Sequence, residues 1–259
     1  MHGILLAVLV VGGTGIIIGL LLGISGKIFE VHTDEREVKI RECLPGNNCG
    51  GCGFVGCDSL AKAIANNEAD VNACPVGGAA VAKEIGKIMG VSADAKEVCA
   101  VVCCKGTCDK VGQKFNYYGT MSCSEAAILN GGPKNCSYGC MGLGSCMSVC
   151  EYGAISVVDG VAKVDSELCV GCGKCAKVCP KGLISIIPKD QEEVVLCNNK
   201  DNGKKVREVC SLGCIGCKMC TKNCPTDAVT VTDNLASIDP DLCVGCGLCK
   251  AACPTKVIS

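Results

Sequence analysis

A long apolar run opens the chain. Residues 3–26 contain no charged side chain and are rich in Ile, Leu and Val. About 20 apolar residues cross the hydrocarbon core of a bilayer, so the run predicts one transmembrane helix. A signal peptide fits less well, because no Lys or Arg precedes the run and no A-x-A cleavage site follows it. A buried helix of a soluble domain rarely needs so long an uncharged run.

Basic residues after this run predict its orientation. They are Lys27, Arg36, Lys39 and Arg41. Lys and Arg are enriched on the cytoplasmic side of membrane helices. We therefore expect an anchor at residues 1–27 in the cytoplasmic (inner) membrane, a charged linker at residues 28–42, and the remaining chain on the cytoplasmic side.

Shorter patterns predict small helices and strands beyond the linker. Apolar residues at helical spacing occupy residues 60–65 and 79–89, and the second segment ends at Gly90. A short helix is expected at residues 125–129. Runs of Val, Ile and Ala predict strands at residues 98–104, 154–158, 183–187 and 228–231. The fold class predicted is α+β.

Cysteine changes this picture most. The chain has 28 Cys in 259 residues, and the run C-x2-C-x2-C-x3-C-P occurs three times. The three complete runs are Cys169, Cys172, Cys175 and Cys179; Cys214, Cys217, Cys220 and Cys224; and Cys243, Cys246, Cys249 and Cys253. A degenerate copy contains Cys140, Cys146 and Cys150, with Leu143 where the second Cys belongs. In bacterial ferredoxins the first three Cys of a run hold one [4Fe–4S] cluster, and the fourth ligates the partner cluster.

Four runs therefore predict two tandem ferredoxin-like modules with two clusters each, at residues 136–190 and 191–259. The crossing rule groups Cys169, Cys172 and Cys175 with Cys150, and Cys140 and Cys146 with Cys179. In the second module it groups Cys214, Cys217 and Cys220 with Cys253, and Cys243, Cys246 and Cys249 with Cys224.

Cys136 has two interpretations. It is the obvious substitute for the ligand missing at Leu143. However, its counterpart Cys210 stands at the same offset before a complete run, in the similar motifs Cys136-Ser-Tyr-Gly and Cys210-Ser-Leu-Gly. This likeness indicates an internal duplication, and it leaves open whether Cys136 serves the first module or an extra cluster.

Two further cysteine groups precede the modules. Cys49, Cys52, Cys57 and Cys74 supply four thiolates in a Gly-rich segment, which predicts a small [4Fe–4S] domain at residues 43–90. Cys104, Cys108 and Cys123 lie in a connecting segment at residues 91–135. These three either ligate an extra cluster, have a structural role, or are small buried hydrophobes. The sequence therefore predicts at least five [4Fe–4S] clusters, and six if the extra cluster exists, with iron held through these Cys residues.

Other chemistries fit the sequence less well. Zinc sites use isolated C-x2-C pairs, and disulfide scaffolds belong to short secreted chains. A net charge of −1 does not indicate nucleic acid as a partner. We find no G-x-G-x-x-G in a strand–helix context and no phosphate loop. The two His residues, His2 and His32, flank the anchor, so no catalytic residue is predicted.

Basic residues gather at Lys200, Lys204, Lys205 and Arg207, and at Lys105, Lys110 and Lys114. They either form a docking surface for an acidic electron carrier or are solvated loop charges, and the second interpretation is favoured.

The order of these parts resembles the B subunit of the Rnf complex, a membrane ferredoxin:NAD oxidoreductase that translocates Na⁺ or H⁺. The segment from Leu44 to Gly53, with Cys49 and Cys52, is similar to that family's signature, and the two modules resemble its long form in clostridia and acetogens. The resemblance implies an electron-transfer subunit of a translocase. It would accept electrons from reduced ferredoxin, contact other membrane and peripheral subunits, and contact lipid through residues 3–26. Nicotinamide and flavin would be bound by other subunits.

Two other functions remain as alternatives. A membrane-tethered polyferredoxin could feed a different enzyme, such as a hydrogenase or carbon monoxide dehydrogenase. A redox or metal sensor would require an output domain, and we recognise none in the sequence.

Overall fold

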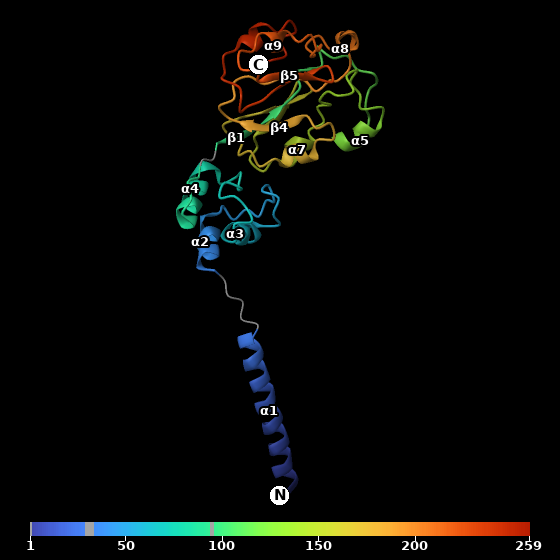
Figure 1. Ribbon diagram of the computed structural model, residues 1–259. Helices are drawn as coiled ribbons and strands as arrows, with labels where there is room; N and C mark the ends of the chain where they lie inside the picture. Colours follow the sequence, from blue (N-terminus) through green and yellow to red (C-terminus); the bar gives the residue numbers. More distant parts are fainter. Residues whose placement is uncertain (1, 29–33, 94–95) are drawn as a thin grey trace.

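The chain consists of one long helix followed by a globular part built from short elements. The computed structural model describes residues 2–28, 34–93 and 96–259. Residue 1 of the predicted anchor, residues 29–33 of the predicted linker with His32, and residues 94–95 of the connecting segment lie outside the described residues. Figure 1 shows α1 (His2–Ile28) at one end, a group of helices in the middle, and the strand-containing part at the other end.

The first helix corrects a prediction from the sequence. α1 covers the predicted anchor, and its side chains are described at residue 3 and at residues 9–25. Among the residues that the structure describes, no helix is both long and apolar enough to cross a membrane. The predicted single-pass anchor over residues 3–26 and the predicted location in the cytoplasmic membrane are therefore not supported.

Three helices form a small apolar core after the first helix. They are α2 (Glu35–Cys43), α3 (Cys57–Ala65) and α4 (Gly78–Met89). Ile40, Leu60, Ile64 and Ile85 are at most 1% exposed in this core. The predicted helices at residues 60–65 and 79–89 are confirmed, and α4 ends at Gly90 in the left-handed conformation. Because α2 packs against α3 and α4, the residues of the predicted linker from Glu35 onward form part of this helical group.

Three two-stranded antiparallel sheets follow. The strands are β1 (Val98–Val102), β2 (Ile155–Val158), β3 (Val161–Val164), β4 (Ile184–Pro188), β5 (Val229–Thr232) and β6 (Leu235–Ile238). β2 pairs with β3, and β5 pairs with β6, as short hairpins. β1 instead pairs with β4, so residues 98–102 join a strand more than eighty residues later. The four predicted strand segments are confirmed, and the mixed helix and strand content agrees with the predicted α+β class.

The two cysteine-rich halves repeat the same arrangement. In each half a hairpin separates two cysteine runs, and a strand from before the first run pairs with the chain after the second. That pairing is β1 with β4 in the first half and the bridge between Val195 and Ile258 in the second. Short helices complete both halves: α5 (Cys123–Ile128), α6 (Ser145–Ser148), α7 (Lys174–Val178), α8 (Gly203–Val209), α9 (Met219–Lys222) and α10 (Leu248–Ala251). Each half has its own core, in which cysteines pack among Val, Ile and Ala.

Candidate iron–sulfur sites

Every cysteine run bends twice through left-handed backbone. The bends lie two and four residues after the first Cys, at Gly142, Gly144, Gly171, Gly173, Gly216, Lys218, Gly245 and Gly247. Alternating backbone conformations of this kind turn successive N–H groups to one side and make a concave anion site. The runs therefore present N–H groups toward the sulfurs of their own cysteines, which suits thiolates bound to iron.

The degenerate run keeps this backbone. Leu143 stands between Gly142 and Gly144, whose φ values of +74° and +81° match those of Gly171 and Gly173 at +68° and +74°. The loop at Leu143 is therefore built like that of a complete run, and it differs in lacking one thiol.

A thiol from another element lies at the site of the degenerate run. Cys123, Cys140, Cys146 and Cys179 line one small pocket. Cys123 begins α5, and its backbone N–H donates to Ser145 Oγ at 2.8 Å, which ties α5 to the start of α6. The structure thus brings Cys123 to the position for which the sequence suggested Cys136. The sequence carried no signal for this, because Cys123 is outside the run.

In the second half, a complete run and one crossing cysteine share a pocket. Cys214, Cys217, Cys220 and Cys253 line it together with Pro254. Cys253 is the fourth Cys of the other run, so the fold supplies the crossing that the ferredoxin pattern requires.

The cysteines of the two remaining complete runs also lie close to one another. Burial, together with the neighbouring thiolates of Cys169 and Cys172, raises the pKa of Cys175 to about 11. Burial likewise raises the pKa of Cys249, with Cys243 and Cys224 among the neighbours that contribute. Cys150, predicted to complete the first of these groups, is half-buried and packs against the same core as Cys175.

The helical domain holds the fifth group. Burial raises the pKa of Cys74, and nearby Cys52 and Cys57 add to this effect. Cys57 is buried at the start of α3, where its N–H donates to Asn48 Oδ1 at 2.8 Å. A Cβ at Gly51 would lie 3.5 Å from Cys49 Sγ and 2.9 Å from the carbonyl oxygen of Cys172. The cysteines of the helical domain therefore lie beside the run that begins at Cys169.

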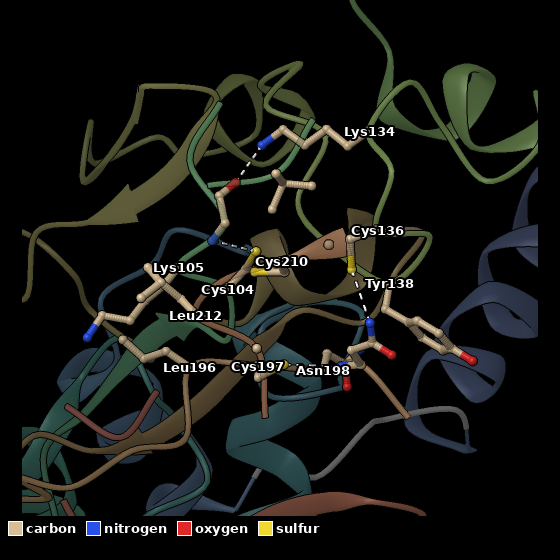
Figure 2. Close-up of a pocket in the computed structure, with 15 residues that line it drawn as sticks. Cys104, Lys105, Lys134, Cys136, Tyr138, Leu196, Cys197, Asn198, Cys210 and Leu212 are labelled. Atoms are coloured by element: carbon tan, nitrogen blue, oxygen red, sulfur yellow. Dashed lines mark hydrogen bonds between the residues drawn. The ribbon is translucent and has the colours of Figure 1, made fainter. Parts of the chain in front are cut away.

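Four cysteines outside these groups line a further pocket. They are Cys104, Cys136, Cys197 and Cys210. Figure 2 shows their side chains around it, together with Lys134 and Leu212. The sequence singled out Cys104 and Cys136 but assigned no role to Cys197 and Cys210. The repeated motifs before the two runs were the signal that could have linked Cys210 to Cys136.

The other cysteines lie apart from these pockets. Cys108, predicted with Cys104 and Cys123, is exposed. Cys99 is buried in β1, and Cys103 Sγ lies 3.6 Å from Ser185 Oγ. Cys43 packs against the helical core. The structure therefore does not bring Cys104, Cys108 and Cys123 together as one group.

The donor set fits iron–sulfur clusters. No cysteine in the described part of the chain forms a disulfide. Backbone N–H groups donate to several sulfurs, including Ala100 N to Cys169 Sγ at 3.3 Å and Leu183 N to Cys179 Sγ at 3.5 Å. Burial, together with the neighbouring Cys140 and Cys123, raises the pKa of Cys146 to about 11, and a thiol that ligates a metal is deprotonated by it. Within the described residues, no three His, Cys, Asp or Glu side chains are placed to hold a single metal ion.

Most of the predicted basic surface makes local contacts. Lys200 and Lys205 pair with Asp233 and Asp201 at 3.8 and 2.9 Å. Lys105 Nζ donates to the carbonyl oxygen of Lys256 at 3.2 Å. These contacts favour the interpretation of these residues as structural or solvated charges.

Comparison with known proteins agrees with this chemistry. Residues 44–76 match a family described as "Putative Fe-S cluster", residues 162–185 match a 4Fe-4S binding domain, and residues 213–257 match a 4Fe-4S dicluster domain. The chain is 46% identical over 243 residues to the B subunit of the Na⁺-translocating ferredoxin:NAD⁺ oxidoreductase complex of Acetobacterium woodii, covering 93% of this chain and 73% of that protein. It is 42% identical to the B subunit of the ion-translocating oxidoreductase complex of Methanosarcina acetivorans, covering 91% and 90%. The B subunit of the proton-translocating ferredoxin:NAD⁺ oxidoreductase complex of Clostridium ljungdahlii is also 42% identical, with 93% and 86% covered.

Proposed function

Since the chain belongs to the B-subunit family of the Rnf complexes, the ion-translocating ferredoxin:NAD oxidoreductases, we propose that it is the iron–sulfur electron-transfer subunit of such a complex. The observation that carries the proposal is the pocket in which Cys253 joins Cys214, Cys217 and Cys220. A cysteine from a second run at this position is the arrangement by which two-cluster ferredoxins hold adjacent clusters.

We assign ligands to five [4Fe–4S] clusters from the groups described above. The sets are Cys49, Cys52, Cys57 and Cys74; Cys150, Cys169, Cys172 and Cys175; Cys123, Cys140, Cys146 and Cys179; Cys214, Cys217, Cys220 and Cys253; and Cys224, Cys243, Cys246 and Cys249. The third set takes Cys123 in place of Cys136, because Cys123 lines the pocket of the degenerate run.

The clusters, when bound, supply one-electron transfer, and the chain supplies position and environment. Its thiolates would hold the iron, and backbone N–H groups such as that of Ala100 would stabilise negative charge on the sulfurs. Apolar residues around the cysteines, including Val102 and Ile184, exclude water from the first half. No residue of this chain is assigned to acid–base or nucleophilic catalysis.

Contacts between the helical domain and the first module keep their cysteines close. Asn47 Nδ2 donates to Tyr152 Oη at 3.2 Å, and Lys177 Nζ donates to the carbonyl oxygen of Gly50 at 3.4 Å. Gly51 lies against Cys172. We therefore propose that these contacts would keep a cluster held by the helical domain close to one held by the run that contains Cys172.

We propose a helical [4Fe–4S] domain at residues 43–90 and two ferredoxin-like modules at residues 136–190 and 191–259. The connecting segment at residues 91–135 contributes β1 to the first module through its pairing with β4. The helix α2 extends the helical domain back to Glu35.

The partners we propose are the other subunits of the complex and reduced ferredoxin as donor. Each reduced ferredoxin gives up one electron, and two electrons with one proton convert NAD⁺ to NADH on another subunit. The chain itself undergoes no net change, because each electron it accepts is passed on. The relatives are subunits of ferredoxin:NAD⁺ oxidoreductase complexes, which favours these partners over the hydrogenase or carbon monoxide dehydrogenase considered from the sequence.

Reduction by ferredoxin tests this function directly. Full-length protein, reconstituted anaerobically with iron and sulfide, is mixed with pre-reduced ferredoxin in one sample and with NADH in another. We expect ferredoxin to bleach the visible absorption of the clusters and to be reoxidised in proportion, whereas NADH alone leaves the absorption unchanged, because no nicotinamide site is expected on this chain. Bleaching by NADH, or none by ferredoxin, would contradict the proposal.

A further inference from the structure

We propose that Cys104, Cys136, Cys197 and Cys210 bind a sixth [4Fe–4S] cluster at the junction of the two ferredoxin-like modules. Two of these cysteines belong to the first half of the repeat and two to the second. The site therefore exists only when both halves are folded against each other.

The pocket resembles those of the runs in size. Its cavity volume is about 20 Å³, equal to that of the pocket at Cys123 and that of the pocket at Cys214. Cys136 is only 9% exposed there, and Val111, Leu196 and Leu212 add apolar walls. Four thiols thus surround a water-sized space inside the protein (Figure 2).

Cys104 and Cys197, which lie farther before their runs than Cys136 and Cys210 do, make equivalent contacts in the two halves. Cys104 Sγ accepts hydrogen bonds from the backbone N–H of Gly106 and from that of Cys140, both at 3.4 Å. Cys197 Sγ accepts from Asn199 N at 3.4 Å and from Cys214 N at 3.3 Å. In both halves the donors are the residue two positions later and the first Cys of the following run. This repetition is expected of a site formed by duplicated ligands.

The other two cysteines come from the repeated motifs Cys136-Ser-Tyr-Gly and Cys210-Ser-Leu-Gly. A Cβ at Gly139 would be in ordinary van der Waals contact with Cys136 Sγ at 3.5 Å and with Cys104 Sγ at 3.7 Å, so this motif lies against both cysteines of the first half. A Cβ at Gly213 would overlap Val206, so the second motif packs closely against α8.

Two polar side chains complete the environment of a negatively charged group. Asn199, 2% exposed, donates from Nδ2 to Cys136 Sγ at 3.5 Å and so joins the second half to the first. Lys134, 3% exposed, lines the pocket, and its ammonium donates to the carbonyl oxygens of Gly106 and Gly160 at 2.8 and 2.7 Å. The positive charge of Lys134 in the wall of the pocket has the sign that offsets a negatively charged group.

The cavity favours a cluster over a zinc ion. Four thiolates also suit Zn²⁺, which they bind at about 2.3 Å. The pockets at the runs leave the same space as this one. The cofactor class is therefore [4Fe–4S].

The position of the site gives it a role. The N–H of Cys140 belongs to a proposed ligand of the first module, and the N–H of Cys214 belongs to a proposed ligand of the second. Each donates directly to a sulfur of the new site. An electron that passes from one module to the other therefore has this site on its path, which makes it the link between the two modules.

Metal analysis of the full-length protein tests the proposal. After anaerobic reconstitution we expect about 24 iron atoms per chain with an equal amount of sulfide, against about 20 for five clusters, and less than one zinc. The variant Cys197→Ala should bind between about one and about four iron atoms fewer than the wild type, because one cluster loses a ligand. Its control, Cys108→Ala, changes an exposed cysteine outside every pocket and should keep the wild-type iron content.

Other results would overturn the site. A wild-type count of about 20 iron atoms with zinc at one per chain, or with no other metal, excludes a sixth cluster. An unchanged iron content in Cys197→Ala excludes these ligands. If that variant does not fold, the wild-type iron and zinc counts decide alone. Reduction by ferredoxin of a protein with about 20 iron atoms would leave the proposed function standing while this inference fails.

Discussion

At the scale of single residues, the missing thiol at Leu143 shows how the fold compensates for one lost ligand. The loop around Leu143 has the same left-handed residues as the complete runs. Cys123 reaches the resulting pocket from a separate helix, which is held by the hydrogen bond from its N–H to Ser145. A thiol missing from the run is thus matched by one from another part of the chain, with little change in the run itself.

This compensation predicts a rescue. Replacing Cys123 with Ala should remove between about one and about four iron atoms, because one cluster loses a ligand. Adding Leu143→Cys to the same chain should restore the iron content, since the loop already holds that position as it does Cys172. The measurement is iron and sulfide content with the EPR spectrum of the reduced protein.

The matched control is Cys136→Ala with and without Leu143→Cys. Because Cys136 lines a different pocket from the degenerate run, Leu143→Cys should not restore the iron that Cys136→Ala loses. Equal rescue of both variants would contradict the assignment of Cys123.

At the scale of elements, the glycine turns couple the runs to the strands. Gly171, with φ +68°, lies against β1, and a Cβ there would be 2.5 Å from Val98 Cγ2 and 2.7 Å from its carbonyl oxygen. Gly182 has a similar φ of +58°, with open space where its Cβ would be. The two positions therefore share backbone strain but differ in packing.

Substitution of these two glycines separates the effects. Gly182→Ala should cost about 1–2 kcal/mol of unfolding free energy, the usual cost of a left-handed alanine. Gly171→Ala should cost more, about 3 kcal/mol or above, because β1 must move away from the run. Anaerobic denaturant unfolding of the iron-loaded protein measures both, and equal costs would contradict the packing of β1 on the second run.

Much at this scale was predictable from the sequence. The strands at residues 154–158 and 228–231 and the helix that ends at Gly90 follow from local patterns. The pairing of β1 with β4 did not, because a short apolar run carries no information on a partner so distant in sequence. For the same reason the grouping of Cys104 with Cys197 was not foreseen. Spacing within a run predicts its ligands, whereas tertiary contacts decide which isolated cysteines meet.

At the scale of the whole molecule, the cysteine groups form a continuous series. Gly51 places the helical domain beside Cys172, the first module holds two groups, and Cys104 and Cys197 connect it with the second. The apolar cores of the two modules are small and consist partly of cysteines. Bound clusters are therefore expected to hold these modules together as well as to carry electrons.

The most direct test of this account is the iron and acid-labile sulfide content of the full chain purified without oxygen. The account predicts a brown protein with iron and sulfide in equal amounts, at about 20 atoms of each or more per chain. A colourless protein with fewer than about four iron atoms, or one that carries zinc in their place, would contradict it.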